Sequence, residues 1–312
     1  MTDSFTLEPM DVALPRGAFA GGGRDVLRHK SKPVCAFTRA TFRPGLHPVW
    51  TPKGHVVTAE QPADHPHHRG IWVASDHVAL MIDGPDGTER YDYNFYVDTV
   101  FQGRAPGRIE QASLHLATQS DTRALIEQRL EWIGPVEWGA SDGRAVLSER
   151  RWTVVSVLDD AFVLDITSDV TPADNHFMVL GPTRHAWFNA RVADAIALDP
   201  ASAPIDDRGT RGAAAIGPRG LAWVDYSGSV GGGDTAGITM IPDSHDANAW
   251  FVSDWGVMTV GRIRDAGLKF SPGDEVRFCC RYVAHDGDHP PDHALAGLSF
   301  LTPNTMTQGT MP

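Results

Sequence analysis

Residues 151–170 decide the fold class, and they read RWTVVSVLDDAFVLDITSDV. β-Branched and aromatic residues dominate both halves of this stretch, and the two aspartates between the halves (residues 159–160) supply a turn. In the second half, Phe162, Leu164 and Ile166 alternate with residues that are mostly polar, which is the two-residue period of a half-buried strand. The stretch therefore predicts an antiparallel β-hairpin.

The same composition recurs outward from this hairpin. Further strand-like segments lie at residues 113–118, 125–132, 220–226, 237–241 and 276–283. One short helix is expected near the end of the chain, over residues 291–298. Glycine and proline account for 31 and 22 of the 312 residues and are spread along the whole chain, which leaves little room for long helices. The pattern predicts an all-β fold, an antiparallel β-sandwich with few short helices.

The length and the even composition suggest one large unit. We expect residues 1–312 to form a single β-sandwich domain, because neither an internal repeat nor a low-complexity linker divides the chain. An irregular N-terminal arm is expected over about residues 1–30, and a C-terminal tail over about residues 290–312.

Bulk composition restricts the partners and the compartment. With 39 acidic and 27 basic residues the formal net charge is −12, and such a surface repels nucleic acid and anionic membranes. No apolar run approaches the roughly 20 residues that cross a bilayer, and the acidic, polar N-terminus does not resemble a secretory signal. The three cysteines (Cys35, Cys279 and Cys280) have neither metal nor redox spacing, which suits a reducing compartment. We therefore expect a cytoplasmic protein without nucleic-acid or membrane partners; the sequence leaves a homo-oligomer open.

Histidines gather in one part of the chain. Five of the 14 lie between positions 47 and 68, and these are His47, His55, His65, His67 and His68. His77 follows nearby, and the surrounding prolines and glycines place the group in loops. Imidazole gives or takes a proton near neutral pH, and its neutral form binds transition metals. In an extended chain His65 and His67 share one face and His68 points to the other, so at most two converge without a bend at Pro66.

Two further patches could complete a site. The first, residues 180–189, follows an apolar strand and combines Arg184, His185, Trp187 and Asn189. Planar polar groups beside flat aromatic rings are what sugar-binding sites use, although a buried aromatic strand explains the patch equally well. The second, residues 282–289, carries His285 at the end of a strong strand, where it could instead cap a turn.

Two histidine segments resemble the hallmark of the PmoA-like family. Residues 46–54 read LHPVWTPKG and residues 64–72 read DHPHHRGIW, and the family combines such a His-Pro pair with Asp-His-Pro-His-His-Arg and an aromatic strand. Residues 237–240 and 282–287 are similar to its closing region, so the resemblance covers about residues 30 to 290. The family is named after a methane oxygenase, an activity that would require membrane spans that this sequence lacks.

The resemblance implies a fold and a class of substrate. It implies work on carbohydrates or oxidised (keto) sugars, and a fold similar to the galactose-mutarotase-like (aldose-epimerase) supersandwich. In that fold, histidines and a carboxylate on the concave sheet carry out acid–base chemistry on a bound sugar.

Together these observations predict a carbohydrate-active enzyme of the epimerase, lyase or hydrolase type that uses histidine acid–base chemistry on a sugar or keto-sugar. The candidate catalytic residues are His67, His68 and His185. The candidate substrate-binding residues are Arg69, Trp72, Asp76, Arg184, Trp187, Asn189 and His285. In this prediction the arginines stabilise developing negative charge and the tryptophans stack on the sugar.

Two alternatives stay open. In the first, the protein is a metal-dependent enzyme in which a divalent transition metal (zinc, iron or manganese) activates water. The candidate ligands for that metal are His47, His65, His67 and His77. In the second, the protein is a non-catalytic sugar-binding protein built on the same sandwich. No other cofactor is expected.

Overall fold

The computed structural model describes residues 4–10, 23–39, 42–185, 187–218, 220–244 and 250–295, and its strands form three sheets. The first sheet has the order β1 (Phe5–Met10), β2 (Arg24–His29), β3 (Lys32–Thr38), β4 (Gly45–Val49), β5 (Ile71–Val73), β14 (Phe188–Arg191), β19 (Val257–Val260) and β18 (Trp250–Val252). The second has the order β15 (Ile205–Asp206), β16 (Val224–Gly231), β17 (Asp234–Pro242), β21 (Val276–Asp286), β12 (Ala161–Pro172), β11 (Ala145–Val157), β10 (Arg123–Ile133) and β9 (Arg108–Gln119). The third has the order β20 (Leu268–Phe270), β13 (Phe177–Leu180), β6 (Val78–Gly84), β7 (Gly87–Asn94) and β8 (Ala105–Pro106).

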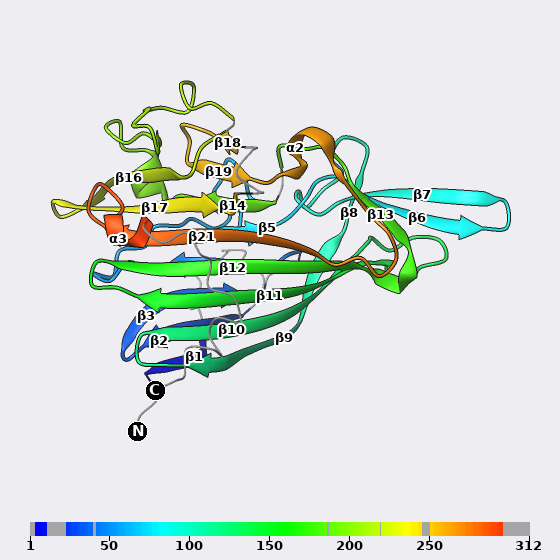
Figure 1. Cartoon of the computed structure of the whole chain (residues 1–312), viewed down its shortest axis with the longest axis horizontal. Helices are drawn as coiled ribbons and strands as arrows, with labels where there is room; N and C mark the ends of the chain where they lie inside the picture. The colour runs from blue at the N-terminus through cyan, green and yellow to red at the C-terminus, as the bar shows by residue number, and fades with distance from the viewer. Residues whose placement is uncertain are drawn as a thin grey trace.

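The two eight-stranded sheets pack against each other. In Figure 1 strands β1 to β3 lie behind β9 to β12, and one hydrophobic core contains side chains of both sheets, such as Phe37 and Leu46 from the first and Ile126 and Leu164 from the second. Neighbouring strands are antiparallel except for the pair β7 and β8. The predicted antiparallel β-sandwich is confirmed.

Helices are short in the described part of the chain. They are the 3-10 turn η1 (Ala173–Asn175) and the single-turn helices α1 (Asp194–Ala197), α2 (Ile263–Ala266) and α3 (Asp292–Leu295). The helix expected over residues 291–298 is confirmed where α3 lies; it begins after Pro291, and residues 296–298 fall outside the described residues. None of the described helices combines the length and apolar character that crossing a bilayer requires.

The hairpin at residues 151–170 forms as predicted, from β11 and β12, but its second strand is buried on both faces. Leu164 and Ile166 enter the shared core, while Val163 packs on the other face in a small cluster with Ala294 of α3. Asp165 also lies on that other face and binds Arg281 through two hydrogen bonds of 2.6 and 3.0 Å. The alternation of polar residues suggested a solvent-facing side; in the structure a paired charge and a short helix cover it.

The N-terminal arm, expected to be irregular, contains two paired strands. β1 pairs with β2 over its whole length, from Phe5 opposite His29 to Met10 opposite Arg24, and β2 continues into β3. These strands were not recognised in the sequence because each mixes polar and apolar residues, which their partly exposed side chains allow.

Candidate functional site

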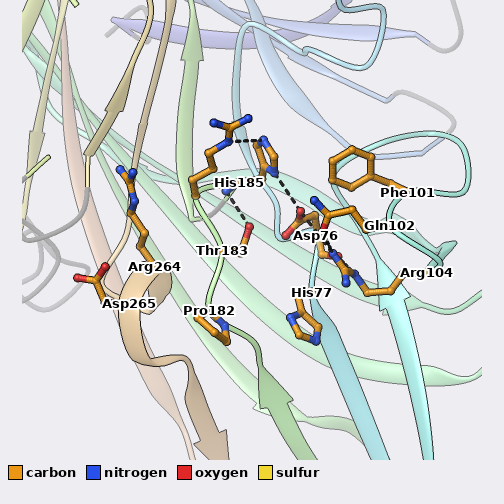
Figure 2. A pocket seen from close by; sticks show the side chains of 11 residues that line it. Asp76, His77, Phe101, Gln102, Arg104, Pro182, Thr183, His185, Arg264 and Asp265 are labelled. Carbon is orange, nitrogen blue, oxygen red and sulfur yellow. Dashed lines mark hydrogen bonds and ion pairs between the residues drawn. The ribbon is translucent and has the colours of Figure 1, made fainter. Parts of the chain in front are cut away.

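The candidate site is a pocket of about 430 Å³ at one end of the third sheet, shown in Figure 2. Four segments line it, and each of them adjoins a strand of that sheet. Residues 76–77 lead into β6, residues 101–104 lead into β8, residues 182–185 follow β13, and residues 264–265 of α2 precede β20. Residues far apart along the sequence are therefore brought together by the pairing order of one small sheet.

The centre of the pocket is a pair formed by His185 and Asp76. The ring Nδ1 of His185 lies 2.9 Å from Oδ2 of Asp76, and Nε of Arg184 donates to Nε2 of the same ring at 3.3 Å. Since Arg184 can only donate, Nε2 accepts, and Nδ1 must carry the proton that binds Asp76. The His185 side chain is 17% exposed and that of Asp76 is 2% exposed. A buried carboxylate thus holds a ring that is partly open to solvent.

Arg104 also contacts Asp76. Nε of Arg104 donates to the backbone carbonyl of Asp76 at 2.6 Å, and its Nη2 lies 3.7 Å from the carboxylate. Burial by itself would raise the pKa of Asp76, but the hydrogen bonds of His185 and Thr183, together with the charge of Arg104, outweigh it and hold this pKa below its ordinary value. An ionised Asp76 therefore fixes the orientation of the His185 ring and holds its proton on Nδ1.

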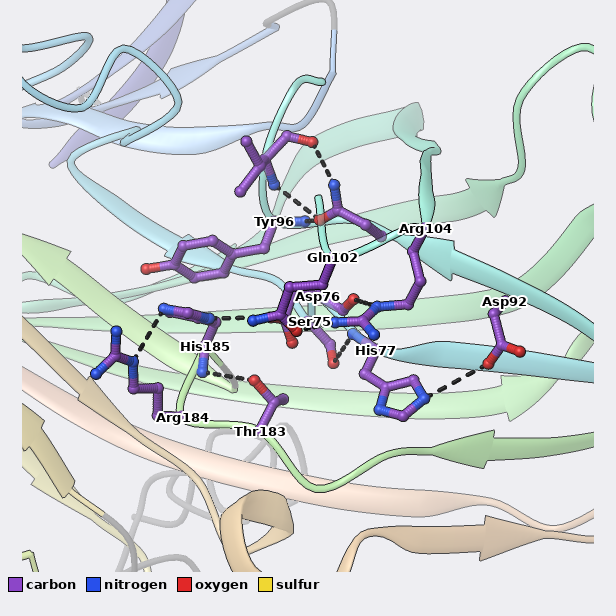
Figure 3. A network of polar contacts seen from close by, with 12 residues as sticks. Ser75, Asp76, His77, Asp92, Tyr96, Gln102, Arg104, Thr183, Arg184 and His185 are labelled. Atoms are coloured by element: carbon purple, nitrogen blue, oxygen red, sulfur yellow. Dashed lines mark hydrogen bonds and ion pairs between the residues drawn. The ribbon is translucent and has the colours of Figure 1, made fainter. Parts of the chain in front are cut away.

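His77 shapes the pocket through close packing. Figure 3 shows it beside Asp92, whose Oδ1 lies 3.5 Å from its Nε2. The chain leaving β13 passes directly over the His77 ring, and a Cβ added at Gly181 would lie 2.0 Å from its Nδ1. The backbone N–H of Gly181 also donates to the carbonyl of His77 at 2.9 Å. Glycine at position 181 is what allows β13 to deliver His185 to the pocket.

Two aromatic rings flank His185. The rings of Tyr96 and Phe101 have centroids 5.0 and 5.6 Å from that of His185. The loop carrying Tyr96 is held by Asn94, whose side-chain oxygen accepts hydrogen bonds from the backbone N–H groups of Tyr96 and Val97. Burial raises the pKa of Tyr96, so its hydroxyl stays protonated.

The histidine cluster, which we define as His65, His67 and His68, lies next to the pocket. The rings of Trp255, His65, His68 and Trp72 form a continuous stack with successive centroid distances of 4.3, 4.8 and 4.8 Å. His67 meets His68 edge-on at 4.6 Å. All three imidazoles come together because residues 65–68 turn: the N–H of His68 donates to the carbonyl of His65 at 3.0 Å. In an extended chain at most two of these three histidines could converge; the bend at Pro66 allows all three to do so.

Two members of the cluster are neutral: His68, which is buried, and His67, which is partly buried. Burial lowers the pKa of His67 to about 4, with Arg43 contributing, and burial together with the other two histidines lowers the pKa of His68 further. Nδ1 of His68 and Nε1 of Trp72 are buried without a hydrogen-bond partner in the described part of the protein. Tyr96 links the cluster to the pocket, since its ring lies 5.6 Å from that of His67 and 5.0 Å from that of His185.

The four candidate metal ligands are not brought together. Nδ1 of His47 lies 3.0 Å from the hydroxyl of Thr58, and His77 faces Asp92, whereas His65 and His67 belong to the histidine cluster. Among the residues that the structure describes, no group of three or more histidine, cysteine, aspartate or glutamate side chains could hold a metal ion. The proposed ligand set is corrected because it joined residues that the sheet order separates.

Several candidate substrate-binding residues lie away from the pocket. Trp72, Trp187 and Asn189 are fully buried, so the two indoles present no free stacking face. Arg69 is buried and binds Asp98 at 2.8 Å. His285 is buried on β21 and belongs to a different part of the fold. Of the candidate catalytic and substrate-binding residues, Asp76, Arg184 and His185 line the pocket.

Five pocket residues escaped the sequence analysis: Phe101, Gln102, Arg104, Arg264 and Asp265. They lie in short loops or a single helical turn with no distinctive neighbours, so no local pattern marks them. Arg104 could have been found only through its contact with Asp76, which is a product of the fold.

Comparison with known proteins identifies the family of this chain. The model described as "Family of unknown function (DUF6807)" matches residues 19–298, and the chain belongs to that family. The expected membership of the PmoA-like family is wrong, because the histidine segments that suggested it lie inside the range matched by this other family. No curated protein matches the chain significantly.

Solved structures resemble the chain at low identity. The galactose mutarotase related enzyme from Lactobacillus acidophilus has a TM-score of 0.33 and 6% identity, over 84% of this chain and 94% of its own. The GH36 alpha-galactosidase AgaA from Geobacillus stearothermophilus has a TM-score of 0.40 and 7% identity, over 87% of this chain but 40% of its own. The 4-alpha-glucanotransferase from Thermococcus litoralis has a TM-score of 0.35 and 10% identity, over 89% of this chain and 39% of its own. At these values the likeness says nothing of ligand or reaction.

Proposed function

We propose that this member of the DUF6807 family is an acid–base enzyme that acts on a carbohydrate-derived carbonyl compound, with His185 as its general base. One observation carries the proposal: His185 lines a pocket with its Nδ1 bound to the buried, ionised Asp76, which leaves Nε2 as the accepting nitrogen. A partly exposed imidazole held by a carboxylate is an arrangement suited to proton transfer.

The reaction we propose begins at a carbon next to a carbonyl group. Nε2 of His185 takes the proton from that carbon once the substrate draws the guanidinium of Arg184 away from this nitrogen. The electron pair of the C–H bond becomes a carbon–carbon double bond, and the π pair of the carbonyl group moves to its oxygen to form an enediolate. Arg184, whose Nε lies 3.3 Å from Nε2, stabilises the negative charge that develops. The proton on His185 exchanges with solvent, and return of a solvent-derived proton to the carbon completes the cycle, so that hydrogen is exchanged and no oxidant or reductant is required.

The pocket suits a small polyhydroxylated molecule. Its volume of about 430 Å³ lies in the range of small-molecule sites. The hydroxyl of Thr183 and the amide of Gln102 can bind hydroxyl groups, while the ring of Phe101 offers an apolar face. Figure 2 shows these side chains around the pair of His185 and Asp76.

Proton exchange tests the proposal directly. We expect the protein to catalyse incorporation of deuterium from D₂O into a sugar-derived carbonyl compound, followed by ¹H NMR with D-glucuronate, D-galacturonate, 2-keto-D-gluconate, D-fructose and D-glucose as probes. His185→Gln should lower the exchange rate by a factor of about 100 or more, within the usual range for a lost acid–base group.

The matched control is His115→Gln, which changes an exposed histidine on β9 and should leave exchange unaltered. Circular dichroism and the thermal midpoint verify that both variants fold. Full exchange in His185→Gln would overturn the assignment of the base. Saturable binding of a probe without exchange of any of them would instead identify a non-catalytic binding protein.

A further inference from the structure

Two of the three arginines in the pocket lack a carboxylate partner. Arg104 lies 3.7 Å from the Asp76 carboxylate, but neither Arg184 nor Arg264 forms an ion pair in the described part of the chain. Arg184 donates to the neutral acceptor Nε2 of His185, and Arg264 donates to a backbone carbonyl. Figure 2 shows Arg264 beside the Pro182–Thr183 segment that leads to His185.

Strand β18 holds both unpaired guanidinium groups. Nη1 of Arg264 donates to the backbone carbonyl of Trp250, and the guanidinium of Arg184 lies over the ring of Phe251, 4.9 Å from its centroid. Trp250 and Phe251 are consecutive residues, so the two cations are anchored to adjacent points of one strand. Such anchoring fixes their positions before any ligand arrives, which lowers the entropy cost of binding.

Arginines elsewhere around the site are paired with acids. Arg191 binds both carboxylate oxygens of Asp64 at 3.1 Å, and Arg69 donates to Asp98 at 2.8 Å. Arg184 and Arg264 depart from this pattern because neither is paired with an acid. Two like charges in one pocket repel each other, so their presence without acidic partners costs energy in the absence of a bound anion. Asp265 also lines the pocket, but Figure 2 shows it on the side of Arg264 away from His185. The position between Arg184 and His185 is therefore electropositive.

We infer that Arg184 and Arg264 bind an oxyanion of the substrate, so that the pocket takes an acidic sugar derivative rather than a neutral sugar. This inference rests on the proposed function for the reaction at His185 and names the class of its substrate. Guanidinium groups bind carboxylate and phosphate through paired, charge-assisted hydrogen bonds. Because Nε of Arg184 lies 3.3 Å from Nε2 of His185, the bound oxyanion sits next to the base. The acidic group of the substrate is accordingly close to the carbon that loses its proton.

Calorimetric titration of the full chain tests this inference with D-glucuronate, D-glucose 6-phosphate and D-glucose. We expect at least one of the two acidic probes to bind about tenfold or more tightly than glucose, and its affinity to fall as salt is added. Arg184→Met and Arg264→Met should each weaken that acidic probe by about 10- to 100-fold, the range of a hydrogen bond to a charged group, and leave glucose unchanged. The ranking of glucuronate against glucose 6-phosphate shows whether carboxylate or phosphate is the bound group.

Arg129→Met is the matched control, since it removes an exposed arginine from β10. Circular dichroism verifies folding of each variant, and the exposed position of Arg184 makes its variant informative even if Arg264→Met unfolds. Equal binding of glucose and the acids, or unchanged affinity for the acids in Arg184→Met, would overturn the inference. Tight, arginine-dependent binding of an acid without proton exchange would support the oxyanion site. The same result would refute only the proposed reaction at His185.

Discussion

Two histidine–aspartate pairs in this protein have the same contact distance and opposite surroundings. His185 and Asp76 lie 2.9 Å apart at the edge of a pocket, whereas His285 and Asp225 lie 2.9 Å apart with both side chains 0% exposed. The first pair uses Nδ1 of its ring, and its Nε2 accepts a hydrogen bond from the exposed side chain of Arg184 at the pocket. The second uses Nε2, and its Nδ1 lies 3.4 Å from the backbone carbonyl of Asp286. The same two residue types thus form a candidate catalytic pair in one place and a structural link in the other.

The buried pair of His285 and Asp225 connects three strands of the second sheet. Asp225 on β16 accepts hydrogen bonds from Thr239 on β17 and from Ser227, and it binds His285 on β21, so three adjacent strands share one carboxylate. β17 closes over the His285 ring, since a Cβ at Gly237 would lie 2.7 Å from its Nε2, and the second ring nitrogen, Nδ1, faces the backbone carbonyl of Asp286. Access to the second ring nitrogen, rather than the presence of the pair, separates the candidate site from the structural link.

The largest effects should come from removing each carboxylate in turn. Asp76→Asn should lower the exchange rate about 100-fold or more, because His185 loses the group that fixes its proton on Nδ1. Asp225→Asn should lower the free energy of unfolding by about 3 to 5 kcal/mol, because its three donors lose a buried partner, while the exchange rate per folded molecule stays unchanged. NMR exchange and urea unfolding of both variants measure the two effects. A loss of exchange in folded Asp225→Asn would erase the distinction between the pairs.

A third kind of histidine is withdrawn from solvent without a bound carboxylate. Such histidines make the free energy of unfolding depend on pH, which distinguishes them from both pairs. Burial lowers the pKa of His47 and of His67 to about 4, while an unfolded histidine titrates near pH 6.5. Between these values the unfolded chain binds more protons, so the free energy of unfolding rises with pH from about 4 to about 6.5 and is lost as the pH falls. His47→Gln and His67→Gln should each flatten this slope, by at most about 1.4 kcal/mol per pH unit. Urea unfolding at pH 5 and pH 7 measures this change in the free energy of unfolding. An equal change in the wild type and the variants would contradict the prediction.

The smallest effect concerns a supporting group of the buried pair. Ser227→Ala removes a hydroxyl 2.8 Å from Asp225, and it should lower the free energy of unfolding by about 1 kcal/mol, the net worth of one hydrogen bond. Exchange should stay at the wild-type rate. Urea unfolding measures the loss, and a change in exchange would show that the buried pair communicates with the pocket.

The sequence allowed the sandwich to be predicted because its signal is local. The hairpin of β11 and β12 follows from alternation and a two-aspartate turn, both visible within 20 residues. Burial of the second face of β12 was not visible, because it depends on Arg281 and α3, which lie more than 100 residues further along the chain.

The site was predicted only in part, for a related reason. Asp76, Arg184 and His185 were recognised as chemically suitable residues, and the structure brings them together. Trp72 and Asn189 were taken as ligand-binding residues, but they lie on neighbouring central strands of the first sheet and are covered by other segments. A two-residue period places side chains on alternate faces of a sheet without telling which face is open.

The contact between Gly181 and His77 has a consequence for the variation of this family. A Cβ at position 181 would also meet Cγ and Cε1 of His77 at 2.4 Å, so any other residue there requires the His77 ring to move. Substitutions at positions 77 and 181 are therefore expected to occur together. Among relatives that keep the pocket, we expect a ring at position 77 to occur with glycine at 181, and a bulkier residue at 181 to occur with a small one at 77.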